Sequence, residues 1–254
     1  MTIARPSARG TTTVSSDLRS AYPSLSPAPT TQATLTMQAI KDYIIQAHLQ
    51  PGDPLPTESQ LCEDLGVSRS SVREAVRTLV ALDIVEVRHG HGTFVGQASM
   101  RPMVESLVFR GLLNRDKGYQ GLLNVVELRA TLDTALAPEV VRAWKGHQDP
   151  QIEATVEEME ELARRGQPFP EQDRAFHSQL LARLDNPLYR HLTDALWAVH
   201  VLLIPLLRAP EPKDILDTAT SHRQMLRTAQ AGDTDSYLVA IKSHYRPLLA
   251  SVGR

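Results

Sequence analysis

The sequence predicts a mainly α-helical protein with one small β-hairpin, and three observations support this fold class. Apolar residues recur at helical spacing over most of the chain, strand-like alternation is confined to residues 84–95, and turns rich in Gly and Pro separate the helical segments. The 254 residues favour two domains, because one hydrophobic core usually serves about 100 to 200 residues. We expect a tail over residues 1–33, a first domain over 34–97 and a helical domain over 101–254.

The composition excludes several classes of protein. Hydrophobic residues make up 42% and charged residues 22% of the chain, as in a globular protein. Cys62 is the single cysteine, so no internal disulfide is expected. The apolar stretch from Ala195 to Leu207 is shorter than the about 20 residues that a membrane-spanning helix needs. With no export signal at the start, we expect a cytoplasmic protein with no membrane partner.

The first 33 residues are rich in Ser, Thr, Pro, Ala and Gly and have little apolar periodicity, which predicts a disordered tail. Arg5, Arg9 and Arg19 give the tail a slight positive charge that could touch nucleic acid. A solvated extension without a defined role is the simpler interpretation.

Ordered structure is predicted to begin near Leu35. Apolar residues from Met37 to Leu49 have helical spacing and predict a first helix of about 13 residues, which the following prolines and glycine end. Thr57 and Gln60 have the spacing of a capping box, so a short second helix is expected over 58–65.

A third helix and a hairpin complete the first domain. Gly66 suits the left-handed end of the second helix, and Ser68 is an N-cap for a helix that runs to about Leu82. Residues 84–88 and 93–95 alternate like strands around a Gly-containing turn. This order of elements is that of a winged helix-turn-helix, in which the third helix enters the DNA major groove.

The N-terminal end of the third helix and the hairpin tip carry the side chains suited to DNA. Three arginines spaced by four residues lie on one face of the helix, where guanidinium groups could meet guanine edges and phosphates. A slim hairpin tip can enter the minor groove beside this helix. The residues expected to contact DNA are Ser68, Arg69, Ser70, Ser71, Arg73, Arg77, His89 and Gly90.

The overall charge does not by itself indicate a DNA-binding protein. The formal net charge of the chain is −2, and residues 34–97 hold five Lys or Arg against eight Asp or Glu. Three arginines at helical spacing can also form an ordinary solvated face. DNA binding is favoured because four of the five cations fall on the third helix or the hairpin.

Beyond residue 100 the strand signals stop, and turn residues separate seven helical segments, which predict a C-terminal all-α bundle. The predicted segments are 102–114, 120–144, 150–165, 170–184, 187–207, 212–230 and 234–250.

Four residues of this helical domain form a candidate metal site. Asp173 and His177 are four residues apart on one predicted helix, so both can face one centre. His222 and His244 lie on the last two helices, and a bundle can bring all four together in its interior. Three imidazoles and one carboxylate suit a divalent ion such as zinc or nickel. An Asp-x-x-x-His pair alone can also be a surface pair.

The first domain resembles the DNA-binding domain of GntR-family transcriptional regulators. The matching stretches are Leu55-Pro56-Thr57-Glu58, Leu65-Gly66-Val67-Ser68-Arg69, Val72-Arg73-Glu74-Ala75 and Gly90-His91-Gly92-Thr93-Phe94-Val95. The resemblance implies a homodimer on a short palindromic operator, with Arg69 and Arg73 on bases or phosphates and His89 and Gly90 at the wing tip. The family often has an arginine where this chain has Ser59, so one contact to DNA is missing.

The second domain resembles the ligand-sensing domain of the FadR subfamily. The matching stretches are Asp173-Arg174-Ala175-Phe176-His177, Asn186-Pro187-Leu188, Ser221-His222 and Ser243-His244. The resemblance implies that Asp173, His177, His222 and His244 bind the metal. Arg129 in Glu127-Leu128-Arg129 corresponds to an arginine that contacts an acidic effector. Asp133 stands where the family often has Glu.

These observations predict a transcriptional regulator, in particular a repressor, whose binding to double-stranded operator DNA is controlled by a small carboxylate effector at a metal site. Two alternatives stay open. One is a metal-dependent hydrolase, although no His-Glu-x-x-His, Gly-x-Ser-x-Gly or phosphate-loop motif is present. The other is a metal-free regulator that responds to an acyl ligand. His48, His147 and His191 are expected at the surface, and His200 is interpreted as a core histidine or a pocket wall.

Overall fold

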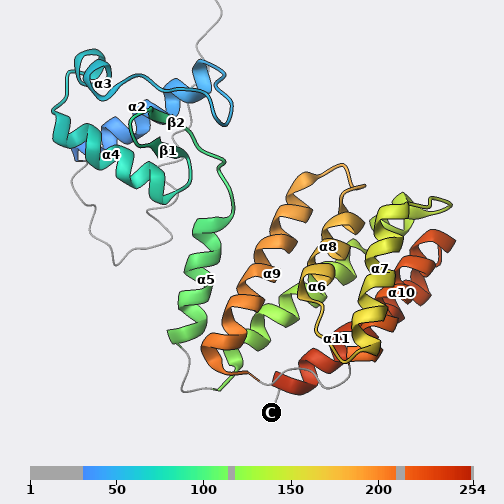
Figure 1. The fold of residues 1–254 in the computed structure, drawn as a ribbon. Helices are drawn as coiled ribbons and strands as arrows, with labels where there is room; N and C mark the ends of the chain where they lie inside the picture. The colour runs from blue at the N-terminus through green and yellow to red at the C-terminus, as the bar shows by residue number, and fades with distance from the viewer. Residues whose placement is uncertain (1–30, 114–117, 210–214, 253–254) are drawn as a thin grey trace, which may run out of the picture. The chain divides into compact units, whose positions relative to one another are not determined.

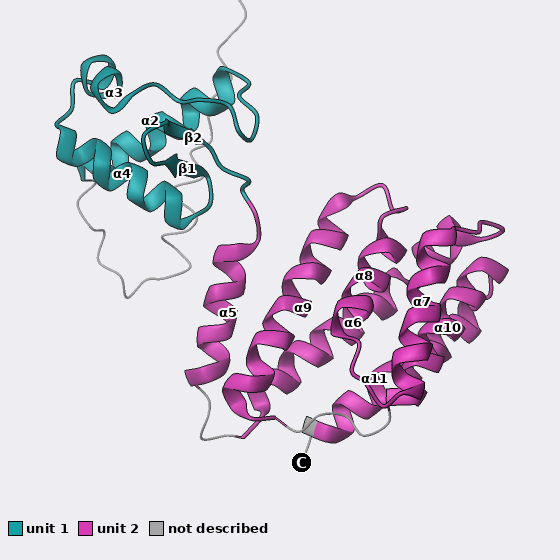
Figure 2. Cartoon of the chain, in the orientation of Figure 1, with its two compact units in different colours: residues 1–98 teal, residues 99–254 magenta. Residues whose placement is uncertain are grey.

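The computed structural model describes residues 31–113, 118–209 and 215–252. The chain divides into two compact units, Met1–Ala98 and Ser99–Arg254 (Figure 2). Most of the predicted tail lies outside the described residues, as do the predicted helix end at residue 114 and the predicted helix start at residue 212.

From residue 31 to residue 98 the first unit has three helices and a two-stranded antiparallel sheet, which confirms the winged helix-turn-helix (Figure 1). Its elements are α2 (Gln32–Gln46), α3 (Glu58–Leu65), α4 (Arg69–Ala81), β1 (Val85–Arg88) and β2 (Gly92–Val95). Helix α2 begins three residues before the predicted onset at Leu35. The Thr31 hydroxyl accepts a hydrogen bond from the Thr34 N–H and caps the helix, and Ala33 is already buried.

The turn between α3 and α4 depends on local hydrogen bonds that the sequence predicted. Thr57 and Gln60 form a reciprocal capping box at the start of α3. Gly66 ends α3 with φ 62°, a left-handed conformation that glycine adopts without strain. The Ser68 side chain then accepts from the Ser71 N–H at the start of α4. These caps set the direction in which the exposed face of α4 points.

The core of the first unit joins α4 to α2 and the hairpin. Val72, Ala75 and Leu79 form the buried stripe of α4 and pack with Ile40 of α2 and Val85 of β1. The opposite face of α4 is left to solvent. The short hairpin is therefore supported by the helices, because two strands alone are marginally stable in water.

The second unit is a bundle of seven described helices, as predicted (Figure 1). They are α5 (Arg101–Leu113), α6 (Gln120–Trp144), α7 (Pro150–Arg164), α8 (Pro170–Leu181), α9 (Pro187–Leu207), α10 (Ile215–Ala231) and α11 (Thr234–Val252). Helix α8 ends three residues before the predicted boundary at residue 184. A short turn separates it from α9, which starts with Asn186 as N-cap and Pro187 in the first turn.

Helix α6 is the central element of the bundle, because it packs against α5, α9, α10 and α11. Trp144, near its C-terminal end, is almost fully buried and donates its indole N–H to the Leu180 carbonyl oxygen of α8 at 2.8 Å. This bond joins the two helices that carry Arg129 and Asp173.

Helix α5 lies close against α6 and α9. A Cβ at Gly121 of α6 would lie 2.7 Å from the Gly111 Cα of α5, and a Cβ at Gly111 would lie 3.0 Å from the Leu203 side chain of α9. The approach at Gly121 requires glycine because the near atom belongs to the backbone, whereas a Cβ at Gly111 would require the Leu203 side chain to shift by a few tenths of an ångström.

Among the described residues, α9 is the one helix long and apolar enough to span a membrane. This is weak evidence for a membrane span, because core helices of bundles have the same composition. Val199 and Leu203 of α9 are buried in the bundle core.

We expect Trp144→Phe to lower the free energy of unfolding of the second unit by about 1–3 kcal/mol. The Leu180 carbonyl would lose its buried donor, and the smaller ring would leave a cavity. Denaturant titration followed by far-UV circular dichroism measures this change. Leu202→Ala, an exposed position on α9, is the control and should change the midpoint little; equal midpoints for both variants would contradict the role of Trp144.

Candidate functional site

The structure brings the four predicted metal-site residues together inside the bundle. Asp173 and His177 come from α8, His222 from α10 and His244 from α11. One ligand atom from each lies within 4.8 Å of those of the other three. The three histidines are buried, with at most 2% of their surface exposed. We call these four residues the Asp-His cluster.

His222 shows that the Asp-His cluster suits a cation. Its Nδ1 lies 2.8 Å from the Thr218 carbonyl oxygen, which can only accept, so Nδ1 carries the hydrogen. In the neutral ring, Nε2 then has a lone pair, and it lies 2.8 Å from the Asp173 Oδ1. Two acceptors at this distance need a positive charge: either a proton on Nε2 or a metal ion bound by both atoms.

Several other nitrogen atoms of the Asp-His cluster are buried without a hydrogen-bond partner among the described residues. They are Nε2 of His177 and both ring nitrogens of His244. Buried polar atoms in folded proteins are nearly always paired, so unpaired imidazoles around a carboxylate indicate a place for a ligand. The donor set fits a divalent ion of the zinc or nickel type.

The electrostatics keep the Asp173 carboxylate charged and favour the neutral forms of His177 and His244. Burial alone would raise the pKa of Asp173, but the hydrogen bond with His222 and the nearby His177 and Arg129 lower that pKa well below its usual value. Burial lowers the pKa of His177, and burial with the neighbouring His222 and His177 lowers the pKa of His244 well below its usual value. These are the protonation states in which both residue types bind metals.

A second layer of side chains orients the Asp-His cluster. The Trp197 indole on α9 donates to Asp173 Oδ2 at 2.8 Å. Asp133 Oδ2 on α6 accepts from the Tyr245 hydroxyl at 2.7 Å and lies 3.6 Å from His177 Nδ1. Outer hydrogen bonds of this kind hold ligands in position. Sequence reasoning did not assign Trp197 or Tyr245 to the site, and a buried polar group on an apolar helix face is the signal that could have found Tyr245.

Arg129, the predicted effector contact, lies beside the Asp-His cluster. It is 2% exposed, and its Nη1 lies 2.6 Å from His200 Nδ1. Its Nη2 is 3.8 Å from Asp173 Oδ2, and neither Nε nor Nη2 has a hydrogen-bond partner among the described residues. A buried guanidinium with unused N–H groups is a strong attractor for an anion.

The remaining histidines divide as expected between surface and core. His48, His147 and His191 are exposed, which confirms the prediction for them. His200 is buried and contacts Arg129.

The predicted DNA contacts of α4 lie on its exposed face. Ser68, Arg69, Ser70, Arg73 and Arg77 are exposed, and Ser71 is half-buried. The Ser68 hydroxyl caps the helix and lies 2.8 Å and 2.9 Å from those of Ser70 and Ser71. The serines therefore have a structural role at the helix start besides any contact to DNA.

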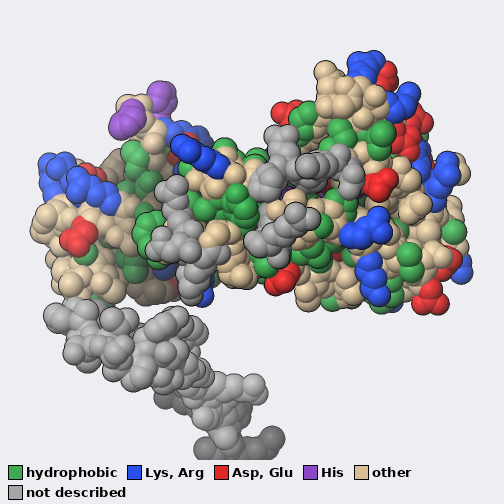
Figure 3. Space-filling view, turned by 90° about the horizontal axis from the view of Figure 1, so that it is seen from below, with side chains coloured by type: hydrophobic (Ala, Val, Ile, Leu, Met, Phe, Trp, Pro, Cys, Tyr) green, Lys and Arg blue, Asp and Glu red, His purple; other side chains and the backbone are tan. Residues whose placement is uncertain are grey.

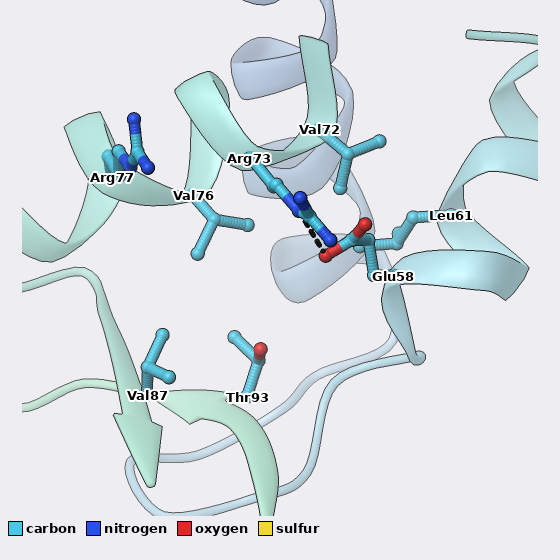
Figure 4. A pocket seen from close by; sticks show the side chains of 8 residues that line it. All are labelled: Glu58, Leu61, Val72, Arg73, Val76, Arg77, Val87 and Thr93. Carbon is cyan, nitrogen blue, oxygen red and sulfur yellow. Dashed lines mark hydrogen bonds and ion pairs between the residues drawn. The ribbon is translucent and has the colours of Figure 1, made fainter. Parts of the chain in front are cut away.

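A groove of about 280 Å³ separates α4 from the hairpin (Figure 4). Val76 of α4 and Val87 and Thr93 of the strands line it, while Arg73 and Arg77 stand along α4. The Arg73 Nε donates to the Glu58 carboxylate of α3 at 2.9 Å, and this bond raises the pKa of Arg73. Sequence analysis did not single out Glu58 as a partner of Arg73.

The hairpin tip is exposed and polar. His89 and Gly90 lie in the turn, and Gly90 adopts φ 76°, a conformation that favours glycine. Arg88 is held on the hairpin by an ion pair with Glu86 and by its position over the Phe94 ring. In the space-filling view, histidine side chains stand on a projection of the first unit, with Lys and Arg side chains elsewhere on its face (Figure 3).

Two family models match the chain. Residues 33–95 match the model of bacterial regulatory proteins of the gntR family, and residues 124–247 match the FCD domain. The regulatory protein NedR of Micromonospora viridifaciens is 41% identical over 103 residues, which cover 41% of this chain and 74% of NedR.

Matches over more of the chain agree with this assignment. The galactonate operon transcriptional repressor of Escherichia coli is 24% identical over 76% of this chain and 84% of that protein. A solved structure of a Streptococcus agalactiae GntR protein is 25% identical, has a TM-score of 0.63 and covers 86% of this chain and 99% of that one. The chain thus belongs to the GntR family of bacterial transcriptional regulators and joins a winged helix-turn-helix DNA-binding domain to an FCD domain.

Proposed function

We propose that this protein is a cytoplasmic, homodimeric repressor whose operator binding is controlled by a small carboxylate effector held at a divalent metal ion. The observation that carries the proposal is the Asp-His cluster, buried in the helical unit directly beside the unpaired N–H groups of Arg129. The FCD domain together with this ligand set supports membership of the FadR subfamily. One relative is named for the galactonate operon, which agrees with an acidic effector.

The first unit supplies the operator contacts. Arg69, Ser70 and Arg73 at the exposed start of α4 would face base edges and phosphates in the major groove. His89 and Gly90 would enter the minor groove. The groove between α4 and the hairpin would then take the intervening phosphate backbone, with Arg77 on its rim. A homodimer supplies two such units for the two half-sites of a palindrome.

The second unit supplies the control. Asp173, His177, His222 and His244 would hold zinc or nickel, and a bound ion supplies Lewis acidity toward an oxygen ligand. Arg129 would bind the effector carboxylate through its unused N–H groups. Effector binding would favour one of two arrangements of the bundle, and so change the affinity for the operator.

Both alternatives make separate predictions. A metal-dependent hydrolase would hydrolyse model esters or phosphates, with loss of turnover in Asp173→Ala. A metal-free regulator would bind no divalent ion and would respond to an acyl ligand. The relatives reported above are named as regulators, which favours the regulatory proposal.

We expect Arg69→Ala to weaken operator binding by about 1–3 kcal/mol, a loss of roughly 5- to 150-fold in affinity, because one guanidinium contact is removed. Fluorescence anisotropy measures this with a DNA fragment selected from random sequence by the wild-type protein. Arg142→Ala, which removes an exposed arginine from α6 in the second unit, is the matched control. Equal affinity of Arg69→Ala and wild type would show that α4 does not contact the operator as proposed.

Glu58→Gln should strengthen non-specific DNA binding and lower the ratio of specific to non-specific affinity. The amide removes the negative charge that compensates Arg73 and leaves it at most a neutral acceptor, so Arg73 turns to phosphates more readily. The dependence of log affinity on log salt should steepen by about 1. Glu63→Gln on the same helix tests for a general charge effect, and an unchanged salt slope in Glu58→Gln would contradict the role of the ion pair.

Zinc or nickel should raise the melting temperature of the chelator-treated protein, because an ion that binds only the folded state stabilises it. At about 1,000 times the dissociation constant the gain is about 4 kcal/mol. His222→Ala should abolish the shift, and His147→Ala, at an exposed histidine, should retain it. Native mass spectrometry gives the number of ions per chain. A wild-type protein that stays metal-free in both measurements overturns the metal proposal.

A further inference from the structure

His200 has no part in the function proposed above, yet it is the hydrogen-bond partner that holds the effector arginine. It lies on α9 among apolar residues, is 7% exposed, and places Nδ1 2.6 Å from Arg129 Nη1. A buried histidine can be satisfied by many backbone groups. Its pairing with a cation requires a specific explanation.

The hydrogen bond between Arg129 and His200 determines the tautomer and the charge of the imidazole ring. A guanidinium has five N–H donors and no acceptor, so Nδ1 of His200 must carry a lone pair and the ring hydrogen must be on Nε2. Burial and the neighbouring Arg129 also lower the pKa of His200 to about 3, so the ring is neutral. Arg129 is thus held by an uncharged acceptor.

The rest of the Arg129 guanidinium is surrounded by other side chains, but no carboxylate of the described residues pairs with it through two hydrogen bonds. The Tyr245 ring centroid lies 5.7 Å from Arg129 Cζ, and the nearest Asp173 oxygen is 3.8 Å from Nη2. Nε and Nη2 keep unused N–H groups although they are buried. A carboxylate in the place of His200 would pair with Arg129 and compete with any acidic ligand, whereas a neutral imidazole orients Arg129 without competing.

We propose that His200 is a positioning residue for effector recognition, which anchors Arg129 through Nη1 as a neutral acceptor and so leaves its remaining N–H groups for the carboxylate of the effector. This inference rests on the proposed function, because it assumes that Arg129 and the Asp-His cluster bind a carboxylate. The inference adds His200 to the residues that determine the affinity of the site for acidic ligands.

The first test is the tautomer of His200 in the full-length wild-type protein. Long-range ¹H–¹⁵N correlation NMR, with the signal assigned by its loss in His200→Asn, should show hydrogen on Nε2 and none on Nδ1 at neutral pH. Hydrogen on Nδ1, or on both nitrogens, would overturn the proposal. This measurement needs neither an effector nor a variant that folds well.

The second test uses acetate, the simplest carboxylate probe, with zinc-loaded protein and isothermal titration. Asn and Asp are equal in size and both accept from Arg129, but only Asp adds a negative charge. We expect His200→Asn to bind acetate within about threefold of wild type, and His200→Asp to bind it at least tenfold more weakly. Zinc affinity in His200→Asn should match that of wild type, because His200 is not a proposed ligand, and the circular dichroism spectrum should be the same in both variants.

The outcomes distinguish a failure of the proposed carboxylate site from a failure of the proposed role of His200. If zinc-loaded wild type binds no acetate, the proposed carboxylate site is wrong, and the role of His200 falls with it. If wild type binds acetate and the Asn and Asp variants bind it equally well, the positioning role of His200 alone is wrong.

Discussion

The interactions inside the helical unit converge on one carboxylate, that of Asp173, whose side chain is 16% exposed. Asp173 accepts from Trp197, lies 2.8 Å from His222 Nε2, and lies 3.8 Å from groups of both His177 and Arg129. These partners come from α6, α8, α9 and α10, so the charge of a single side chain ties four helices together. A buried charge is costly unless it is paired. The four helices must therefore stay packed around Asp173, so that its charge keeps its partners whether or not an ion is bound.

Most of the fold could be predicted from the sequence, because its signals are local. Capping residues such as Thr57 and Ser68, and glycines such as Gly66, act within one helical turn, so the boundaries of α3 and α4 followed directly. The seven helices of the bundle followed from turn residues and apolar periodicity. The early start of α2 was missed because its cap, Thr31, lies in a stretch whose composition resembles a tail.

The candidate site was predictable only in part. Asp173 and His177 share a helix face, and this spacing is visible in the sequence. That His222 and His244 join them was proposed because a bundle can bring the last two helices to the same interior, and the family resemblance supported it. The pairs Arg129–His200, Asp133–Tyr245 and Glu58–Arg73 were not predicted. Each pair joins residues on different helices, and the angle at which two helices pack cannot be inferred from the spacing of apolar residues along either helix.

The glycine contacts of α5 give the bundle a mechanical property. Helix α5 follows the DNA-binding unit directly in the chain and packs against α9. A Cβ added at Gly111 of α5 would lie 3.0 Å from the Leu203 side chain of α9, the helix that also carries Trp197 and His200. When two helices are closely packed, a displacement of one of them moves the other as well. Helix α9 thus contacts the Asp-His cluster through the bond from Trp197 to Asp173, and it also packs against α5, the first described helix after the winged helix-turn-helix unit.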